Sequence, residues 1–494
     1  MLLASVRVRF GYGVHDTRTH KRGVSKTPHT CLVCAAWTRL LERLAYERTP
    51  LIRHRPPTRL TQIDAVLASP LIHSLAAAVP EHKAGRPTRH PLALHLGWAA
   101  IARGFGSGNR LDSELASGDL WGHIVERYNT NAAPHPHGVI VDASIDRLYA
   151  DTHRHTRDRF CETDTLELLC EAFTEHSVAL AQHLGLLIKS EMGSRTLPGQ
   201  RCTIYGDGTI LRPIYSKEAK TRHDPDVITH HRHDGKVVGT KLVHFAVRGT
   251  DPHHRVMLAV GHVADPGREA DRSVELIRKI SAYAPDTISA VAYDGAFRGV
   301  HHNLLMTELG LIVINKPHGS RNKTPRVLAL GTWSHVTPGG TCEHALVSNG
   351  GNVCDATLNE TGQAVLSEPC KRTQVRRYDR TENRYRFSLG VTVPCATGAF
   401  TAWISPHPAP GDTTSGRADQ LRLVSPHEQH FADLYSLRND SEAINANYKL
   451  THTYDRAPVL GWKRQLFDLL AWSLLNNATA QWYNSPQQHN TQAA

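Results

Sequence analysis

The sequence predicts an α/β protein in which a helical region comes first and a mixed region of strands and helices follows. Three observations lead to this prediction. Residues 61–190 place apolar side chains at a period of about 3.6 residues, which is typical of amphipathic helices. After residue 200, short apolar runs typical of strands alternate with helical segments. Between 317 and 424 the chain is rich in Gly, Pro, Thr and Asn and contains alternating, strand-like pieces, which predicts a β-rich insertion.

The helical region contains three strong helix candidates. The first begins at Pro91, because proline is well tolerated in the first turn of a helix. A Gly-rich break at 104–109 separates it from an amphipathic stretch at 111–125, and a long periodic run at 163–187 is the third. Two helices around a Gly-rich turn are compatible with a DNA-reading unit and equally with ordinary bundle packing, so both alternatives stay open.

The mixed region is expected to form a sheet with helices against it. Short apolar runs predict strands at 202–205, 241–247, 255–260, 288–292 and 311–314. Helices are expected at 273–281, 300–309, 431–450 and 463–477. The clearest strands of the insertion are expected at 385–393 and 400–404.

These changes of composition divide the chain into five parts. They are a basic arm (1–60), the helical region (61–198), the mixed region in two pieces (199–316 and 425–480), the β-rich insertion (317–424) and a polar tail (481–494). A chain of 494 residues is long enough for several hydrophobic cores.

Net positive charge is concentrated at the N-terminus. The chain has 57 Lys and Arg against 46 Asp and Glu, a formal net charge of +11. Residues 1–60 contain twelve of the basic residues and three acidic ones, so this arm alone contributes +9. Such an arm can bind nucleic-acid phosphates without sequence preference. The alternative is an incidentally basic extension without a binding role.

Cysteine content and hydropathy argue against two classes of protein. Nine scattered cysteines, an odd number, do not resemble the framework of a disulfide-rich secreted domain. No run of about 18 apolar residues is present, which argues against a membrane protein. Arg7 also interrupts the start of the chain before an apolar signal-peptide core can form. We therefore expect a soluble protein of a reducing cytoplasm.

Cys31 and Cys34 form a Cys-x-x-Cys pair inside the basic arm. Such a pair supplies half of a tetrahedral zinc site, which needs two further thiolate or imidazole ligands. No second close pair follows in the sequence, so zinc at this position is only a weak prediction.

Two aspartates stand in contexts that suit a metal site. Asp207 follows the apolar run at 202–205 between two glycines, and Asp294 follows the run at 288–292 and precedes Gly295. Carboxylates at strand ends, next to glycines that open the backbone, are well placed to hold a hard divalent cation. The alternative for each is an ordinary Asp-Gly turn.

The segment 435–449 is the most informative part of the chain. If it is helical, Tyr435, Arg438, Glu442 and Lys449 share one face. The opposite face is built to pack, with Leu434, Leu437, Ser441, Ile444 and Tyr448 at spacings of three and four residues. The polar face is either a functional group of side chains or a solvated face with an Arg438–Glu442 pair.

The four polar residues of this helix match a family motif. In spacing and identity they resemble the Y-x2-R-x3-E-x6-K motif of a subgroup of DDE transposases from bacterial insertion sequences. The segments YGDGT around Asp207 and AYDGAFRG around Asp294 resemble the two aspartate segments of that family. GRP at 85–87 and LDSEL at 111–115 resemble its N-terminal helical region more weakly. The resemblance covers about residues 85–480 and leaves the basic arm unexplained.

The resemblance implies an RNase H-like catalytic core in the mixed region, interrupted by the β-rich insertion. The helical region is then expected to bind the DNA ends. Asp207, Asp294 and Glu442 are expected to be the catalytic residues and to bind Mg²⁺, with Mn²⁺ as a substitute, in a two-metal mechanism. Tyr435, Arg438 and Lys449, together with Arg298 and Lys316, are the expected contacts to DNA phosphates.

The implied activity is cleavage at the ends of an insertion sequence, followed by transfer of the freed 3′-OH into target DNA. The implied partners are double-stranded DNA, as terminal inverted repeats and as target, and a second copy of the chain or more in the synaptic complex, with no membrane involved. The implied location is the bacterial cytoplasm, at the nucleoid. Two alternatives are a catalytically silent, transposase-derived DNA-binding protein and another RNase H-like DNA nuclease.

Overall fold

The computed structural model describes most of the chain beyond residue 56. The described ranges are 57–80, 88–117, 119–215, 224–232, 235–251, 253–317, 325–380, 384–408, 416–452 and 456–485. The basic arm up to residue 56, with Cys31 and Cys34, and the GRP segment at 85–87 lie outside them. None of the helices in the described part combines the length and apolar character that a membrane span requires.

Helices make up the N-terminal part of the described chain. They are α2 (Arg59–Ala68), α3 (Leu71–Ala77), α4 (Leu92–Gly104), α5 (Gly108–Ala116), α6 (Leu120–Ala132), α7 (Ala150–Phe160) and α8 (Thr163–His183). The helix expected after Pro91 is confirmed as α4. The stretch expected at 111–125 is instead divided between α5 and α6. Helix α8 ends earlier than predicted because Gly185, with a φ of +75°, turns the chain just beyond it.

A mixed sheet follows the helices. Its strands are β1 (Thr203–Leu211), β2 (Ile228–Arg232), β3 (Gly235–Arg248), β4 (Arg255–Val263), β5 (Ala290–Ala292) and β6 (Ile312–Ile314). The order is β2-β3-β1-β5-β6, and β4 pairs with the second half of β3. Strands β1, β2, β3 and β4 pair antiparallel, whereas β5 pairs parallel with both β1 and β6. The central strand β1 therefore joins an antiparallel half to a parallel half.

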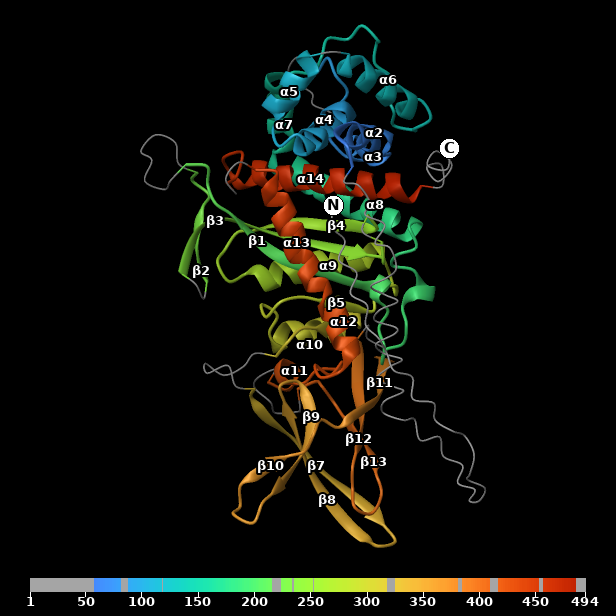
Figure 1. The fold of residues 1–494 in the computed structure, drawn as a ribbon, viewed down its shortest axis with the longest axis vertical. Helices are drawn as coiled ribbons and strands as arrows, with labels where there is room; N and C mark the ends of the chain where they lie inside the picture. The colour runs from blue at the N-terminus through green and yellow to red at the C-terminus, as the bar shows by residue number, and fades with distance from the viewer. Residues whose placement is uncertain are drawn as a thin grey trace, which may run out of the picture. The chain divides into compact units, whose positions relative to one another are not determined.

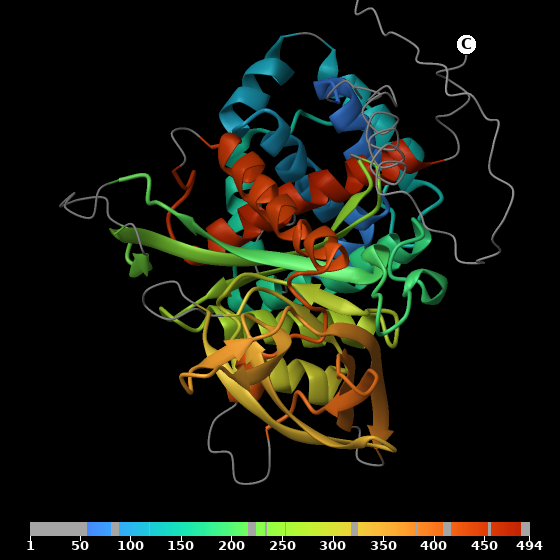
Figure 2. The ribbon, with the colours of Figure 1, turned by 60° about the horizontal axis from the view of Figure 1, so that its bottom comes forward.

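Helices contact this sheet on several sides (Figures 1 and 2). The helices between and after its strands are α9 (Glu269–Tyr283), α10 (Gly299–Leu309), α12 (Gln429–Tyr435), α13 (Leu437–Leu450) and α14 (Trp462–Asn484). Helix α9 packs on β3 and β4, α10 contacts β6, and α13 crosses β1. Helices α8 and α14 both contact β4, and α14 also contacts α2 and α4. Helix α14 thereby connects the N-terminal helices to the sheet.

Antiparallel strands form the insertion, as its alternating sequence predicts. They are β7 (Val327–Thr337), β8 (Gly340–Asn349), β9 (Asn352–Leu358), β10 (Ala364–Leu366), β11 (Lys371–Arg380), β12 (Arg384–Val393) and β13 (Phe400–Ile404). One sheet has the order β10-β9-β8-β7 and the other β11-β12-β13. The short helix α11 (Gly416–Gln420) follows and contacts β7 and α10, which ties the insertion to the mixed sheet.

Pro57–Ala494 is one compact unit with a continuous apolar core. The stacked rings of Phe160 and Phe467, with centroids 5.3 Å apart, illustrate how α7 and α14 share it. Two predicted boundaries change. The helix expected at 431–450 is interrupted at Ser436, between α12 and α13, and α14 continues to Asn484, beyond the expected start of the polar tail at residue 481. The seven described cysteines are free thiols.

Candidate active site

The structure brings Asp207 and Asp294 together at the junction of β1 and β5. In the parallel pairing of these strands, Tyr205 is opposite Ala292. Asp207 lies two residues after Tyr205, and Asp294 lies two residues after Ala292. The two aspartates therefore occupy equivalent positions along these neighbouring segments. The expectation that both lie at strand ends is wrong for Asp207, because β1 continues to Leu211 through its antiparallel pairing with β3.

Burial and mutual repulsion make ionisation of the two aspartates unfavourable. Burial, together with the charges of Asp294 and Glu269, raises the pKa of Asp207 to about 7, although Arg438 opposes them. Burial also raises the pKa of Asp294, despite the hydrogen bond of 2.8 Å that the Ala296 N–H donates to its Oδ1. Shifts of this kind, in groups held against one another, are typical of functional sites.

Glu269 is a third acidic residue near the aspartates, and no sequence pattern pointed to it. It begins α9, is 9% exposed, accepts a hydrogen bond of 2.9 Å from the Tyr293 hydroxyl and forms an ion pair with Lys241. A Cβ at position 208 would come within 2.3 Å of the Glu269 Oε1. A side chain at position 208 would therefore displace the Glu269 carboxylate.

Helix α13 supplies the polar groups that face β1. The Asn445 side-chain amide donates a hydrogen bond of 2.9 Å to Asp207 Oδ2. Asn445 lies three residues after Glu442 and therefore shares its helix face. Its position at the candidate site was missed in the sequence, although this spacing could have revealed it. The predicted packing face is confirmed, since Leu437, Ser441, Ile444 and Tyr448 of α13 and Leu434 of α12 are all buried.

Asp440 anchors α13 to three strands. Its carboxylate accepts hydrogen bonds from the Tyr205 hydroxyl on β1, from Arg248 Nη1 on β3 at 2.7 Å and from Arg255 Nη1 on β4 at 3.2 Å. Only 11% of the Asp440 side chain is exposed. This cluster fixes the start of α13 over β1, and Asn445, five residues later, hydrogen-bonds to Asp207.

Glu442 and Arg438 pair with each other, and the charge of Arg438 acts on both aspartates. Glu442 Oε1 lies 2.7 Å from Arg438 Nη1, and 53% of the Glu442 side chain is exposed. Burial lowers the pKa of Arg438, but Glu442, Tyr435 and the two aspartates together outweigh this effect, so the guanidinium stays charged. In the described part of the chain, no three His, Cys, Asp or Glu side chains are arranged to hold a metal ion. The three expected ligands are thus not assembled as a metal site.

The other predicted phosphate contacts lie on or next to four different elements, and of these Tyr435 interacts electrostatically with Asp294. Tyr435 ends α12, with its ring against Phe431, and Lys316 Nζ lies 5.4 Å from the ring centroid. Lys316 follows β6 and is exposed. Arg298 is an exposed residue at the start of α10, and Lys449 is half-buried in the last turn of α13.

Comparison with known proteins adds no family assignment. No protein-family model matches the chain, and no curated protein matches it. The chemistry of the side chains around Asp207 is therefore the basis for a functional proposal.

Proposed function

We propose that this protein is a DDE-type DNA transposase, which cleaves DNA at insertion-sequence ends and transfers the 3′-OH into target DNA. The observation that carries the proposal is the docking of α13 on β1. In this arrangement, the Asn445 side chain donates a hydrogen bond to Asp207, and Arg438 interacts electrostatically with both aspartates. The mixed sheet with flanking helices, and the β-rich insertion between Asp294 and this helix, fit the RNase H-like plan that the resemblance implies.

The carboxylates fit Mg²⁺ in their chemistry. Mg²⁺ prefers oxygen ligands and is commonly held by one or two carboxylates together with water and substrate phosphates. Asp207 and Asp294 would hold it, because the burial and repulsion that raise the pKa of Asp207 to about 7 favour a bound cation. Bound there, Mg²⁺ would activate the attacking water or 3′-OH and stabilise the leaving oxygen.

Arg438 would exchange partners when DNA binds. A phosphate is a good bidentate partner for a guanidinium. When a phosphate takes Arg438, Glu442 is released from its present ion pair, and its half-exposed side chain can turn toward the aspartates. Lys316, Tyr435, Lys449 and Arg298 would hold neighbouring phosphates. In this proposal, Glu442 completes the acidic site only with DNA present.

A cleavage assay tests the proposal. The substrate is duplex DNA with the inverted repeats that flank the gene, incubated with the full chain and Mg²⁺, Mn²⁺ or EDTA. We expect cutting and strand joining with either metal and none with EDTA. Asp207→Asn and Glu442→Gln should abolish cutting and leave end binding largely intact. Glu275→Gln, at an exposed position of α9, is the matched control and should cut normally.

Each failure of this assay has a distinct meaning. Normal cutting by Glu442→Gln contradicts the role of Glu442. End binding without nicking by the unaltered chain indicates a silent, transposase-derived DNA-binding protein. Metal-dependent nicking without joining, on any DNA, indicates another RNase H-like nuclease.

A further inference from the structure

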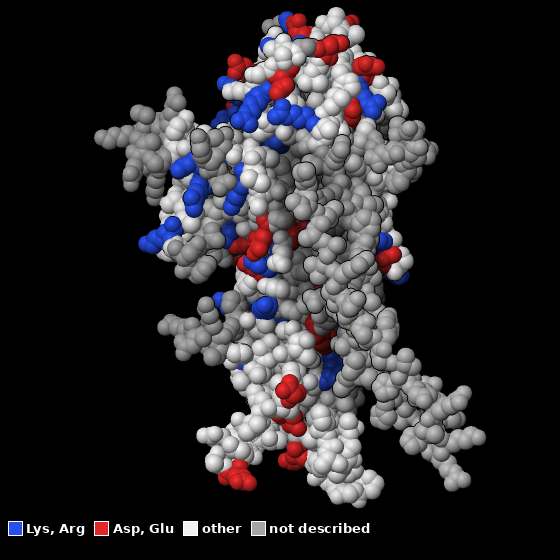
Figure 3. Space-filling view, in the orientation of Figure 1, with Lys and Arg blue, Asp and Glu red and all other residues white. Residues whose placement is uncertain are grey.

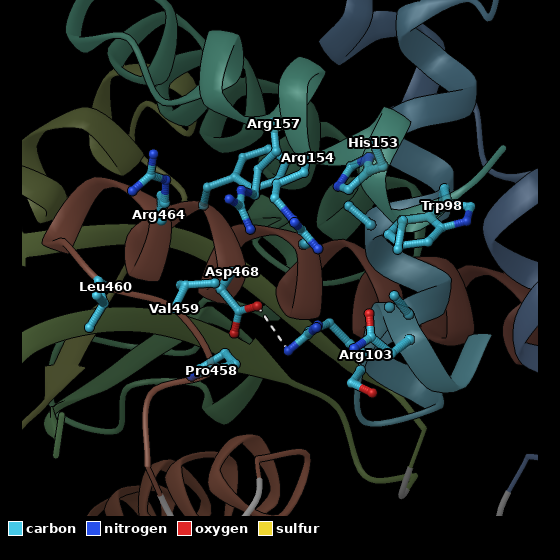
Figure 4. A pocket seen from close by; sticks show the side chains of 18 of the residues that line it. Trp98, Arg103, His153, Arg154, Arg157, Pro458, Val459, Leu460, Arg464 and Asp468 are labelled. Carbon is cyan, nitrogen blue, oxygen red and sulfur yellow. Dashed lines mark ion pairs between the residues drawn. The ribbon is translucent and has the colours of Figure 1, made fainter. Parts of the chain in front are cut away.

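A cavity of about 580 Å³ lies between the N-terminal helices and α14 (Figure 4). Its walls come from α4, the start of α5, α7, α14 and the segment 458–460. None of the candidate active-site residues lines it. Its volume is within the range of about 300–1,000 Å³ that is usual for small-molecule sites. It is therefore a second candidate site, separate from the carboxylates.

Arginines from three helices line this cavity. Arg154 and Arg157 belong to α7, Arg103 to α4 and Arg464 to α14 (Figure 4). Asp158 accepts hydrogen bonds from both Arg157 and Arg464, so one carboxylate serves two guanidinium groups. Arg154 pairs with Asp151 at the surface, where 56% and 82% of the two side chains are exposed. Such a surface pair contributes little and exchanges easily.

Among the residues that line the cavity, Asp468 is the one with an acidic side chain, and its carboxylate is already paired with Arg103. Its carboxylate lies 2.9 Å from Arg103 Nη1, 3.1 Å from the Tyr448 hydroxyl and 3.0 Å from His452 Nε2. Arg103 and His452 hold the pKa of Asp468 below its usual range although burial raises it. Asp468 therefore neutralises Arg103. Arg154, Arg157 and Arg464 share the carboxylates of Asp151 and Asp158, which leaves one positive charge in excess.

A buried histidine in the wall has an unused hydrogen-bonding group. His153 is 6% exposed, and its Nδ1 has no hydrogen-bond partner among the described residues. Burial lowers the pKa of His153 well below its usual range, so the imidazole is neutral. The Nδ1 atom has almost no accessible surface, so His153 contributes to the cavity wall by packing and not by a hydrogen bond to a ligand.

We propose that this cavity binds a nucleotide through its phosphate. Guanidinium groups match phosphate oxygens in geometry and charge, and Arg157 and Arg464 have only one carboxylate between them. Pro458, Val459, Leu460 and Phe467 form an apolar wall that suits a sugar and base. The volume exceeds what inorganic phosphate alone would fill. The nucleotide is either free or an unpaired residue of a DNA strand, because both present the same chemistry.

Calorimetric titration of the full chain tests this proposal. The probe is deoxyadenosine 5′-monophosphate, with deoxyadenosine and inorganic phosphate as comparison ligands. We expect the monophosphate to bind at least about tenfold more tightly than either of them, because only it engages both the arginines and the apolar wall. Arg157→Gln should weaken its binding by about tenfold or more, since one charge-assisted contact is lost.

Matched controls separate the cavity from other basic surfaces. Arg157→Gln leaves Asp158 paired with Arg464, so the fold is retained, which circular dichroism checks. Arg278→Gln removes the same charge from an exposed pair with Glu308 on α9 and α10 and should leave affinity unchanged. Asp207→Asn should also bind the nucleotide normally, because the proposal does not depend on DNA cleavage. Equal binding of nucleoside and nucleotide, no binding of the nucleotide, or unchanged affinity in Arg157→Gln overturns the proposal.

Competition distinguishes the two sources of the nucleotide. If a short single-stranded oligodeoxynucleotide displaces the mononucleotide, and Arg157→Gln weakens both, the cavity takes a residue of a DNA strand. If the mononucleotide binds and the oligodeoxynucleotide does not displace it, the cavity takes a free nucleotide.

Discussion

Asp207 shows at the scale of one residue how a carboxylate held among other acidic groups opposes stability. Its ordinary pKa of 3.8 applies in the unfolded chain, whereas burial, Asp294 and Glu269 raise it to about 7 in the folded protein. Below about pH 4 the group is protonated in both states and has no effect on stability. Above pH 7 it is ionised in both states, and the folded state carries the full penalty, on the order of 4 kcal/mol. The penalty therefore develops between pH 4 and 7.

Asp207→Asn should make the protein more stable at neutral and alkaline pH. Asparagine keeps the shape of the side chain and removes the unfavourable charge. We expect a higher melting temperature than that of the unaltered chain at pH 8 and a much smaller difference at pH 4.5, measured by thermal unfolding without metal. Asp433→Asn, at an exposed position of α12, is the control and should show no such pH-dependent gain. A variant less stable than the unaltered chain at pH 8 would contradict the electrostatic account of this site.

The sequence identifies the two aspartates and misses their neighbours for a physical reason. Asp207 and Asp294 each stand beside glycine next to an apolar run, which is a local pattern. Glu269 reaches them only because α9 begins where β1 and β3 pass, and that depends on how distant segments pack. The pairing of Glu442 with Arg438 was one of the two alternatives that the helix pattern left open. Which partner a side chain on this helix face takes depends on tertiary contacts, and the spacing of residues in the sequence does not reveal them.

At the scale of elements, helical periodicity was the most reliable information. The apolar face of 434–448 is buried as its spacing predicts. The interruption at Ser436 was not predicted, because the residue remains in a right-handed helical conformation and no Pro or Gly marks the break. Strand pairing could not be predicted either. The order β2-β3-β1-β5-β6 follows from contacts between segments that are far apart in the chain.

The hydrogen bonds of Asp440 hold α13 against the sheet, and Asp440→Ala should weaken this attachment. The substitution leaves the Tyr205 hydroxyl, Arg248 and Arg255 without their shared acceptor in a mostly buried site. Breaking a buried pair by removing one partner costs about 3–5 kcal/mol. We expect a loss of this order in the free energy of unfolding, measured by denaturant titration. Amide hydrogen exchange in α13 should also become faster.

Asp433→Ala is the matched control for this helix. It removes an exposed acidic residue of α12 and should change the free energy of unfolding by less than about 0.5 kcal/mol. If Asp440→Ala unfolds at the same denaturant concentration as the unaltered chain, the cluster does not anchor α13. A second check is cleavage activity, which should fall in Asp440→Ala because Asn445 no longer stays on Asp207.

At the scale of the molecule, the balance of charged groups differs from one part of the surface to another. On the face shown in Figure 3, Lys and Arg side chains gather around the β2–β3 hairpin, whereas basic and acidic side chains are mixed over the N-terminal helices. The insertion strands there show mostly uncharged side chains and a few acidic ones. Asp207 and Asp294 lie half-buried at the junction of β1 and β5, whereas the Glu442 side chain on α13 is 53% exposed. Net charge alone could not have located them, because it reports only the excess.

Most of the net charge belongs to the N-terminal arm, so deleting residues 1–56 should change how DNA binding depends on salt. These residues contain eleven Lys and Arg against three acidic residues. Cutting after residue 56 keeps Thr58, whose side chain caps α2 by accepting from the Thr61 N–H. Each phosphate contact that is lost should reduce the slope of log K against log salt by about 0.9. We expect weaker binding and a flatter slope, measured by fluorescence anisotropy from 50 to about 300 mM salt.

The same deletion separates the role of the arm from that of the proposed catalytic centre. Weaker binding with an unchanged salt slope would show that the arm does not contact phosphates. A variant in which the eleven basic residues of the arm are replaced by Gln keeps its length and should reproduce the flatter slope. At low salt and saturating DNA, both altered chains should still cut with Mg²⁺, because Asp207, Asp294 and Glu442 all belong to the compact unit Pro57–Ala494. Loss of cutting under these conditions would mean that the arm contributes to the active site itself.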